Sequence, residues 1–336
     1  MRGHSKLQKI FCKRLDKKYH KDLLENLDEG GRVRLRSCSG PFAAGWQLAS
    51  PAHAAEKLDD IEYSLTARAL LGQSVRPASA LACQNIAGSG ARVGVPCGEA
   101  LCEAAHHAHR CARGGRVLRR TRAVEDVWED IHKECGYATA RQVHVPAWDR
   151  LKRLCRAAAC ERVGLAVRGA GAEVCAACGA ATAEETEEAI LDLEVSSASC
   201  PRLFFDVTVR HSVPGNAERH RTASRQDGVV AAEAETDKRA RYPEGVAPWR
   251  ALPLAHETYG RLGPCAVRHL KLLAREEAAR AGADDEDGWG ARNLAARWGA
   301  RLSVALHRAN VAAVLGASGV QRDARTQWLE SDAFRA

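Results

Sequence analysis

Long apolar runs are absent from the sequence. No window approaches the roughly 18 consecutive apolar residues of a membrane-spanning helix, and the N-terminal residues lack the apolar core of a secretory signal. We therefore expect a soluble protein inside the cell, nuclear or cytoplasmic, with no membrane partner. Without export, a disulfide framework is a poor explanation for the thirteen cysteines, because thiols stay reduced inside cells. Metal binding or plain buried thiols explain them better.

Basic residues are in excess. The chain has 50 Lys and Arg against 42 Asp and Glu, a formal net charge of +8, and residues 1–21 hold eight of the basic residues with one Asp. This excess suits a polyanion such as nucleic acid, although an ordinary solvated surface also produces it. Apolar residues in the same segment recur at helical spacing: Leu7, Ile10, Phe11, Leu15 and Tyr19. They favour an amphipathic helix docked on the rest of the chain over a transit peptide or a nuclear signal.

The 336 residues are enough for two or three structural units. Periodicity and Gly stops predict helices and strands that interleave in the middle of the chain, which favours an α/β core with helical flanks. The expected helices are 58–72, 119–136, 228–242, 263–282 and 291–316, and the expected strands are 141–146, 190–195, 203–209 and 249–258. Residues 28–46 read as irregular, 73–96 as loop, 211–227 as a polar connection, and 150–188 as poorly patterned.

A cluster of Cys and His residues occupies 83–111. Closely spaced thiolate and imidazole donors over Gly-containing turns are what tetrahedral Zn²⁺ needs, and the ion supplies folding energy that a short loop lacks. Cys97, His107 and Cys111 are the main candidates; Cys83 and Cys102 compete for the fourth position, and His106 and His109 are alternates. Free thiols and solvated histidines are the competing interpretation. A separate pair, Cys175 and Cys178, has no second pair and reads as incidental.

Two short apolar runs, 190–195 and 203–209, each carry a central aspartate. If they form a hairpin about Ser199, paired residue numbers sum to 398, and Asp192 faces Asp206. Like charges at this separation are unfavourable unless a shared proton, a lysine or a divalent cation offsets them. A solvated hairpin face in another register is the alternative.

The helix that follows the hairpin adds further chemistry. Glu235, Lys238 and Tyr242 lie at i, i+3 and i+7, on one helical face that could cover the carboxylates. Asp192 and Asp206 would then bind Mg²⁺, Glu235 could add a ligand, and Lys238 could orient water or stabilise charge on a phosphate. A solvent-exposed ion pair between Glu235 and Lys238 is the simpler alternative.

Several phrases in fixed order resemble one family. "RVRLRSCSGPFAAGW", "LDDIEYSLTARALLG", "HHAHRCARGG", "EAILDLEV", "FFDVTVRH", "GVVAAEAETDKRARY" and "ETYGRLGPCAVRHLKLLA" resemble the region downstream of the reverse transcriptase in non-LTR retrotransposons with a restriction-enzyme-like endonuclease. The resemblance covers residues from about 25 to about 318 and rests on the order of the phrases, since no single one is diagnostic.

The resemblance implies a CCHC zinc element before a PD-(D/E)xK nuclease core, an α/β fold with helical flanks that cuts DNA with Mg²⁺ or Mn²⁺. The catalytic residues would be Asp192, Asp206 and Lys238, with Tyr242 behind the lysine. Zinc would be held by Cys97, His107, Cys111 and either Cys83 or Cys102. The implied regions are a basic, mainly helical segment 1–80, a zinc element 81–115, the endonuclease-like domain 116–282 and a helical segment 283–336.

Some positions depart from the family pattern. Leu191 stands where the fuller motif has proline, Thr208 stands where an ExK sequence has its lysine, and "RRTR" replaces an Arg-His pair. We expect a retroelement-derived endonuclease that nicks DNA, with RNA as another possible ligand and a reverse transcriptase supplied in trans as a partner. A catalytically decayed nucleic-acid-binding zinc module, or a remnant without function, is the alternative.

Overall fold

The computed structural model describes residues 3–49, 56–86, 94–155, 157, 174–175, 178–197, 202–282 and 289–320. Its contacts divide the chain into two compact units, each assembled from separated segments. Unit 1 comprises 1–135, 207–236 and 253–336, and unit 2 comprises 136–206 and 237–252. The protein is therefore mixed α/β with helical flanks.

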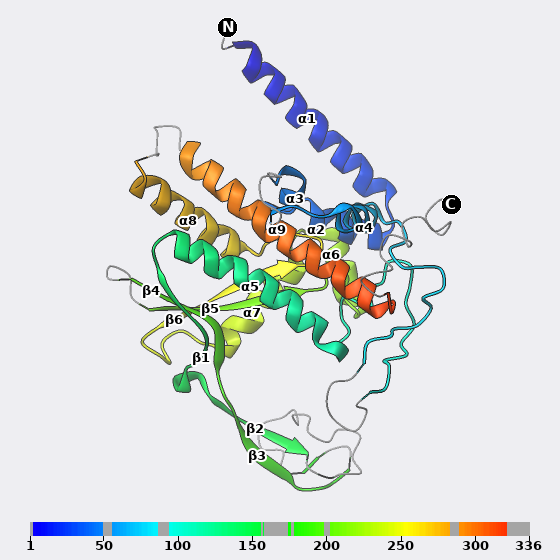
Figure 1. Cartoon of the computed structure of the whole chain (residues 1–336), viewed down its shortest axis with the longest axis vertical. Helices are drawn as coiled ribbons and strands as arrows, with labels where there is room; N and C mark the ends of the chain where they lie inside the picture. Colours follow the sequence, from blue (N-terminus) through cyan, green and yellow to red (C-terminus); the bar gives the residue numbers. More distant parts are fainter. Residues whose placement is uncertain are drawn as a thin grey trace. The chain divides into compact units, whose positions relative to one another are not determined.

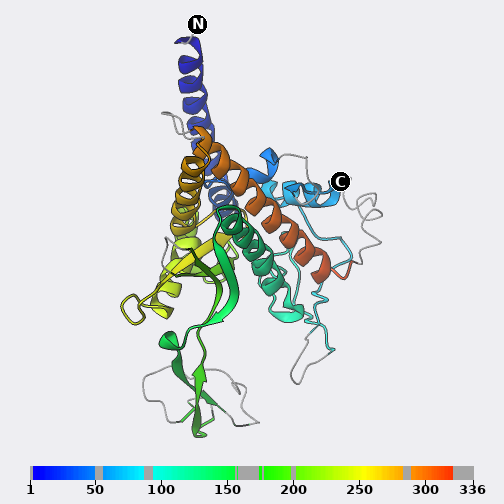
Figure 2. The ribbon, with the colours of Figure 1, turned by 60° about the vertical axis from the view of Figure 1, so that its left-hand side comes forward.

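Unit 1 is mainly helical. Its helices are α1 (Gly3–Asn26), α2 (Glu29–Cys38), α3 (Gly45–Leu48), α4 (Asp60–Leu71), α5 (Arg116–Glu134), α6 (Ala217–Arg225), the first part of α7 (Val229–Arg241), α8 (Pro264–Arg280) and α9 (Trp289–Ala317). Helices α5, α8 and α9 lie side by side in both ribbon views (Figures 1 and 2). Fully buried Trp128 and Trp298 lie in this group, and the indole N–H of Trp298 donates to Glu134 at 2.8 Å.

The predicted helix limits near residues 58–72 are confirmed in α4. Asp59 accepts the backbone N–H of Glu62, and the Glu62 carboxylate accepts the N–H of Asp59, which forms a reciprocal capping box. Gly72 ends the helix with a left-handed φ of 77°, a conformation that glycine adopts without steric cost. Gly136 and Gly282 have the same sign of φ after α5 and α8.

Two expectations for the N-terminal region are wrong. Residues 28–46 are not irregular throughout: Asp28 caps the N-terminus of α2 through the N–H of Gly31, and this cap outweighs the low helix propensity of two glycines. Helix α1 forms as predicted, but Leu15 and Tyr19 are 48 % and 61 % exposed. These two side chains are therefore not docked as an amphipathic face would require.

Unit 2 is built on strands. It holds β1 (Ala138–His144), the 3-10 helix Pro146–Trp148, β2 (Arg150–Cys155), β3 (Thr182–Glu187), β4 (Ile190–Ser196), the start of β5 (Leu203–Arg210), the end of α7 and the start of β6 (Arg250–Glu257). Four strands form one sheet in the order β1-β4-β5-β6, and β2 pairs with β3 in a separate two-stranded sheet (Figure 1). The poorly patterned stretch 150–188 thus contains β2 and β3, and the polar connection 211–227 contains α6.

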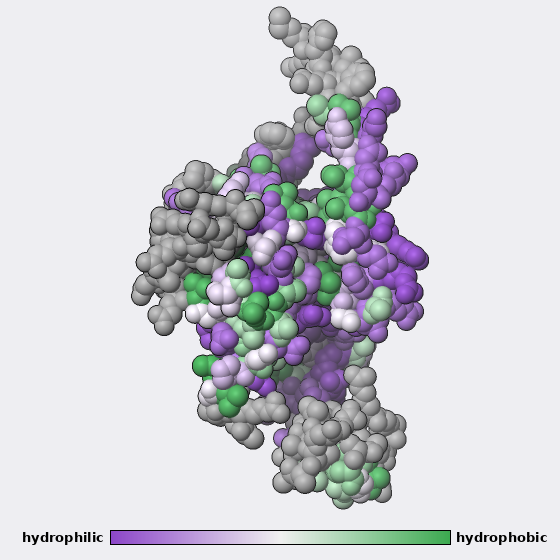
Figure 3. All heavy atoms as spheres, turned by 90° about the vertical axis from the view of Figure 1, so that its right-hand side faces the viewer, coloured by the Kyte–Doolittle hydropathy of each residue, from purple (hydrophilic) through white to green (hydrophobic). Residues whose placement is uncertain are grey.

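Within the described residues, no helix combines the length and the apolar character needed to cross a membrane. The large apolar side chains that remain exposed come from separate parts of the chain, for example Leu48, Leu71 and Leu151. Figure 3 shows one face on which hydrophobic and hydrophilic residues are interspersed, as is usual for a protein surface.

Candidate functional site

The first candidate site, in unit 1, starts from two chain segments that run antiparallel. Bridges join Ala82 to Ala100 and Ile86 to Pro96. Between them, the N–H of Cys83 donates to Glu99 at 2.8 Å and the N–H of Gly98 donates back to Cys83 at 2.9 Å. This pairing holds Cys83 and Cys97 near each other although 13 residues separate them in the sequence.

The other half of this site is a single tight turn. The N–H groups of Arg110 and Cys111 both donate to the carbonyl of His107, at 2.9 and 2.8 Å. Residues four apart in such a turn project to the same side. His107 and Cys111 therefore present their side chains together.

The four ligand atoms fit a zinc ion. The Sγ atoms of Cys83 and Cys111 are 3.8 Å apart, and Cys97 Sγ lies 3.4 Å from His107 Nε2. All four atoms lie within 4.8 Å of one another. With Zn–S near 2.3 Å and Zn–N near 2.05 Å, tetrahedral coordination gives S–S edges of about 3.8 Å and S–N edges of about 3.6 Å. Zinc is therefore supported by the donor set and by its spacing.

The structure affects the protonation of the candidate ligands in different directions. Burial raises the pKa of Cys83 to about 12. Burial also acts to raise the pKa of Cys111, but hydrogen bonds from Asn85, the Arg113 backbone and neighbouring thiols outweigh it and lower that pKa. Burial lowers the pKa of His107, which favours the neutral imidazole that binds metal. Thiol protons would leave when a cation binds.

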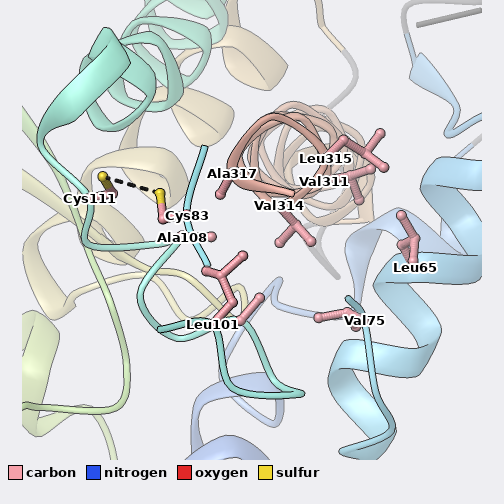
Figure 4. Close-up of a cluster of buried hydrophobic side chains, with 11 residues drawn as sticks. Leu65, Val75, Cys83, Leu101, Ala108, Cys111, Val311, Val314, Leu315 and Ala317 are labelled. Carbon is pink, nitrogen blue, oxygen red and sulfur yellow. Dashed lines mark hydrogen bonds between the residues drawn. The ribbon is translucent and has the colours of Figure 1, made fainter. Parts of the chain in front are cut away.

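A packed shell supports the ligands. Cys83 and Cys111 are buried in a hydrophobic cluster with Leu65 of α4 and with residues of α9 (Figure 4). The other members of this cluster are Val75, Leu101, Ala105, Ala108, Val311, Val314, Leu315 and Ala317. Asn85, 3 % exposed, accepts from Arg116 at 2.9 Å, and Arg116 also donates to Ala312 at 3.0 Å. This shell fixes the ligand loop on the end of α9.

The remaining Cys and His candidates lie elsewhere. Cys102 is exposed, and its Sγ accepts the N–H of His106 at 3.3 Å. The ring of His106 lies 3.0 Å from His211 Nε2, and His109 stacks on His211 with ring centroids 5.1 Å apart. Of the two competitors for the fourth position, the structure brings Cys83 and not Cys102 to the other three ligands.

The second candidate site, in unit 2, is the strand pair β4 and β5. The observed partners Leu193 with Phe205 and Val195 with Leu203 have numbers that sum to 398, as predicted. Burial alternates along β4, with Leu191, Leu193 and Val195 buried. If the register continues one step beyond these observed pairs, Asp192 lies opposite Asp206.

Asp206 is held by two groups from the end of α7. Its side chain is 5 % exposed, and Lys238 Nζ lies 2.7 Å from Oδ1 and 2.8 Å from Oδ2. Burial, then the charge and hydrogen bond of Asp206, raise the pKa of Tyr242. The phenol of Tyr242 therefore stays protonated and can donate a hydrogen bond to the carboxylate of Asp206.

Aromatic packing fixes Tyr242 in this position. The ring of Trp148 contacts it edge to face, with centroids 5.7 Å apart. The guanidinium of Arg241 lies 5.1 Å from the same ring centroid and donates to the carbonyl of Trp148. Tyr242 belongs to an apolar cluster with Leu191 and Phe204, so the tyrosine and both strands share one small core.

Asp192 belongs to the same neighbourhood. Its charge contributes to the raised pKa of Tyr242, and its Oδ1 accepts from Gln142 Nε2 at 3.3 Å. Gln142 lies in β1 with a left-handed φ of 51°, which is uncommon for a residue with a side chain and marks local strain. Nothing in the sequence signals this residue.

Glu235 has a different position from the one expected. Its side chain is buried, and Oε1 accepts the N–H of Cys265 at 2.8 Å. Cys265 is in the first turn of α8, where free N–H groups and the helix dipole favour an acidic partner. We therefore assign Glu235 to the N-terminus of α8 and not to the Asp206 group.

Sequence reasoning also missed Cys155, whose thiol lies with those of Cys175 and Cys178. Its position five residues before Cys160 was the available signal. Comparison of the chain with protein-family models, curated proteins and solved structures gives no match.

Proposed function

We propose that the chain is a retroelement-derived, metal-dependent DNA endonuclease whose reacting groups are Asp192, Asp206 and Lys238. The observation that supports this most strongly is a buried carboxylate, Asp206, in contact with the ammonium group of Lys238 and opposite a strand that carries Asp192. Carboxylates that bind a divalent cation and a cationic side chain that stabilises charge are groups that phosphodiester hydrolysis uses.

The carboxylates fit a divalent cation. With formal charges, Asp192, Asp206 and Lys238 sum to one negative charge, which a dication would compensate. Asp206 Oδ1 is buried, and the Lys238 ammonium lies 2.7 Å from it. Carboxylate oxygens are preferred ligands of Mg²⁺ and Mn²⁺. Such an ion, when bound, would lower the pKa of a water molecule and neutralise charge on the phosphate.

The side chains then have distinct roles. Asp192 and Asp206 would hold the cation from opposite strands, Lys238 would orient the attacking water or stabilise the phosphate, and Tyr242 would fix the orientation of Asp206 through its phenol. Gln142 would fix Asp192 in the same way. This division gives each group one testable function.

The basic charge supports DNA as the substrate. On α1, the basic side chains Lys13, Arg14, Lys17, Lys18 and Lys21 are all exposed, and the chain carries +8 overall. Exposed lysines bind the phosphate backbone without reading its sequence. A nuclear enzyme that nicks target DNA beside a reverse transcriptase supplied in trans fits these features.

One observation favours the alternative of a decayed binding module. Lys238 already neutralises Asp206 directly, so the pair satisfies itself without a cation. A protein that keeps this pair as a structural contact would bind nucleic acid but not cut it.

A nicking assay tests the proposal. Zinc-loaded full-length protein is incubated with supercoiled plasmid in Mg²⁺ or Mn²⁺, or with a chelator of divalent ions. We expect metal-dependent nicking, lowered at least about a hundredfold in Asp192→Asn and Asp206→Asn. Glu194→Gln is the matched control, because Glu194 lies on the same strand as Asp192 but is paired with Arg202 at 2.6 Å.

The outcomes separate the hypotheses. Nicking that both Asn variants retain in full would contradict the proposed centre. A wild-type protein that shifts the plasmid on a gel without cutting it would support the binding module. A protein that neither cuts nor shifts DNA would support a remnant.

A further inference from the structure

A second group of three thiols lies in unit 2, outside both sites described so far. Cys155 ends β2, whereas Cys175 and Cys178 precede β3. Their Sγ atoms all lie within 4.8 Å of one another. Cys155 and Cys175 are 0 % and 2 % exposed.

Backbone hydrogen bonds hold Cys175 and Cys178 close to each other. The N–H groups of Cys178 and Gly179 point to the carbonyl of Cys175, at 3.3 and 2.7 Å, and the N–H of Cys175 donates to Ala180 at 2.8 Å. Gly179 has a left-handed φ of 69°, which disfavours any residue with a side chain. The Sγ atoms of Cys175 and Cys178 consequently lie within 4.8 Å of each other.

The third thiol comes from the paired strand. Cys155 is the partner of Thr182 in the antiparallel register of β2 with β3, and Val174 bridges to Ala181 just before that pair. The register therefore places Cys155 beside the turn. Its Sγ lies 3.6 Å from that of Cys178, near the edge of about 3.8 Å expected between thiolates around zinc and well beyond the roughly 2.05 Å of a disulfide.

Within the described residues, the β2–β3 hairpin has a small buried core. Its buried apolar cluster consists of Cys155 and Cys175 themselves, with Ala157 packed against them. Described side chains of the two strands also form ion pairs near the surface, such as Arg153 with Glu184 at 2.6 Å, which contribute little in water. Isolated two-stranded hairpins are marginally stable. A metal ion would supply the missing stabilisation, as it does in other small coreless elements.

We propose that Cys155, Cys175 and Cys178 bind a second zinc ion, separate from the Cys83 site, that fixes the β2–β3 hairpin. Each thiol loses its proton on binding. A fourth cysteine, Cys160, lies near these residues in the sequence but outside the described residues, so the site is argued from three thiols. The proposal does not depend on nuclease activity.

Zinc content of the purified full-length chain tests the site. We expect about two zinc ions per chain, falling by about one in Cys175→Ser and by about one in Cys111→Ser. Cys265→Ser, a buried thiol outside both groups, is the matched control and should keep the wild-type content. A Cys175→Ser protein with the full wild-type zinc content would overturn the proposal.

A second measurement does not depend on the folding of a variant. Wild-type protein reconstituted with Co²⁺ should show thiolate-to-cobalt absorption that saturates at about two equivalents. Digestion without reductant, followed by mass spectrometry, should recover Cys155, Cys175 and Cys178 as free thiols once metal is removed. Saturation at one equivalent with a disulfide among these three cysteines would overturn the proposal.

Discussion

Lys238 Nζ lies 2.7 Å from Oδ1 and 2.8 Å from Oδ2 of Asp206, a carboxylate whose side chain is 5 % exposed. The two residues are 32 positions apart in the sequence. They are in contact because the C-terminal end of α7 lies beside β5, the strand that carries Asp206. A buried charge with one cationic partner is sensitive to the loss of that partner.

Replacement of Lys238 should therefore destabilise the fold. We expect Lys238→Met to lower the free energy of unfolding by about 2 kcal/mol, because Asp206 would stay buried without its cation. Urea denaturation measures the change. Lys238→Arg keeps the charge and should lose less, and adding Asp206→Asn to Lys238→Met should recover part of the loss. An unchanged unfolding midpoint in Lys238→Met would contradict the role of the pair.

Tyr242→Phe should remove a hydrogen bond that depends on pH. The raised pKa of Tyr242 means that the folded state favours the protonated phenol. Its contribution, about 1 kcal/mol, is therefore complete below the unfolded pKa of about 10 and is lost as the pH rises through the folded pKa. Urea unfolding from pH 8 to pH 11 should show wild type and variant converging. A difference that stays constant over this range would refute the assignment.

The first zinc site predicts a contrast between two nearby cysteines. Cys111→Ser should lose about one zinc ion per chain, because its thiolate is one of four ligands. Cys102→Ser should keep the wild-type zinc content, because Cys102 is exposed and accepts a backbone N–H instead. Equal loss in both variants would return Cys102 to the ligand set.

Buried histidines predict acid sensitivity in unit 1. The Nε2 atoms of His132 and His269 are 2.8 Å apart, and burial lowers their pKa values to about 4 and about 3. A lowered pKa gives stability that is present above the unfolded value of about 6.5 and is lost as the pH falls below it.

Unfolding at about pH 7.5 and about pH 5 should then differ by about 1–2 kcal/mol for each such histidine. His269→Gln should reduce this pH dependence, because glutamine does not titrate. Arg153→Gln, in the exposed β2–β3 hairpin, is the control and should leave the slope unchanged. The same slope in wild type and His269→Gln would refute the assignment.

Local sequence patterns predicted the structural features that depend on residues close together in the sequence. Alternation along β4 gave the hairpin register, and the spacing of Cys97, His107 and Cys111 gave most of the first zinc site. Lys238 and Tyr242 were placed together because they share a helical face. Each of these inferences needs only one or two adjacent elements.

The missed features depend on contacts between distant segments. Glu235 finds its partner at Cys265, 30 positions away, and helical periodicity does not reveal that contact. The left-handed backbone of Gln142 follows from its place in the sheet. Cys155 lies beside Cys175 and Cys178 because β2 pairs with β3. These two strands are rich in charged residues and have no alternating apolar pattern from which they could be predicted.

The central claim is that Asp192 and Asp206 together bind one divalent cation. Titration of zinc-loaded protein with Mn²⁺, followed by electron paramagnetic resonance of the free ion, measures it directly. We predict about one bound Mn²⁺ per chain, lost in Asp192→Asn and in Asp206→Asn and kept in Glu194→Gln. Mn²⁺ binding at the wild-type level in both Asn variants would contradict the claim.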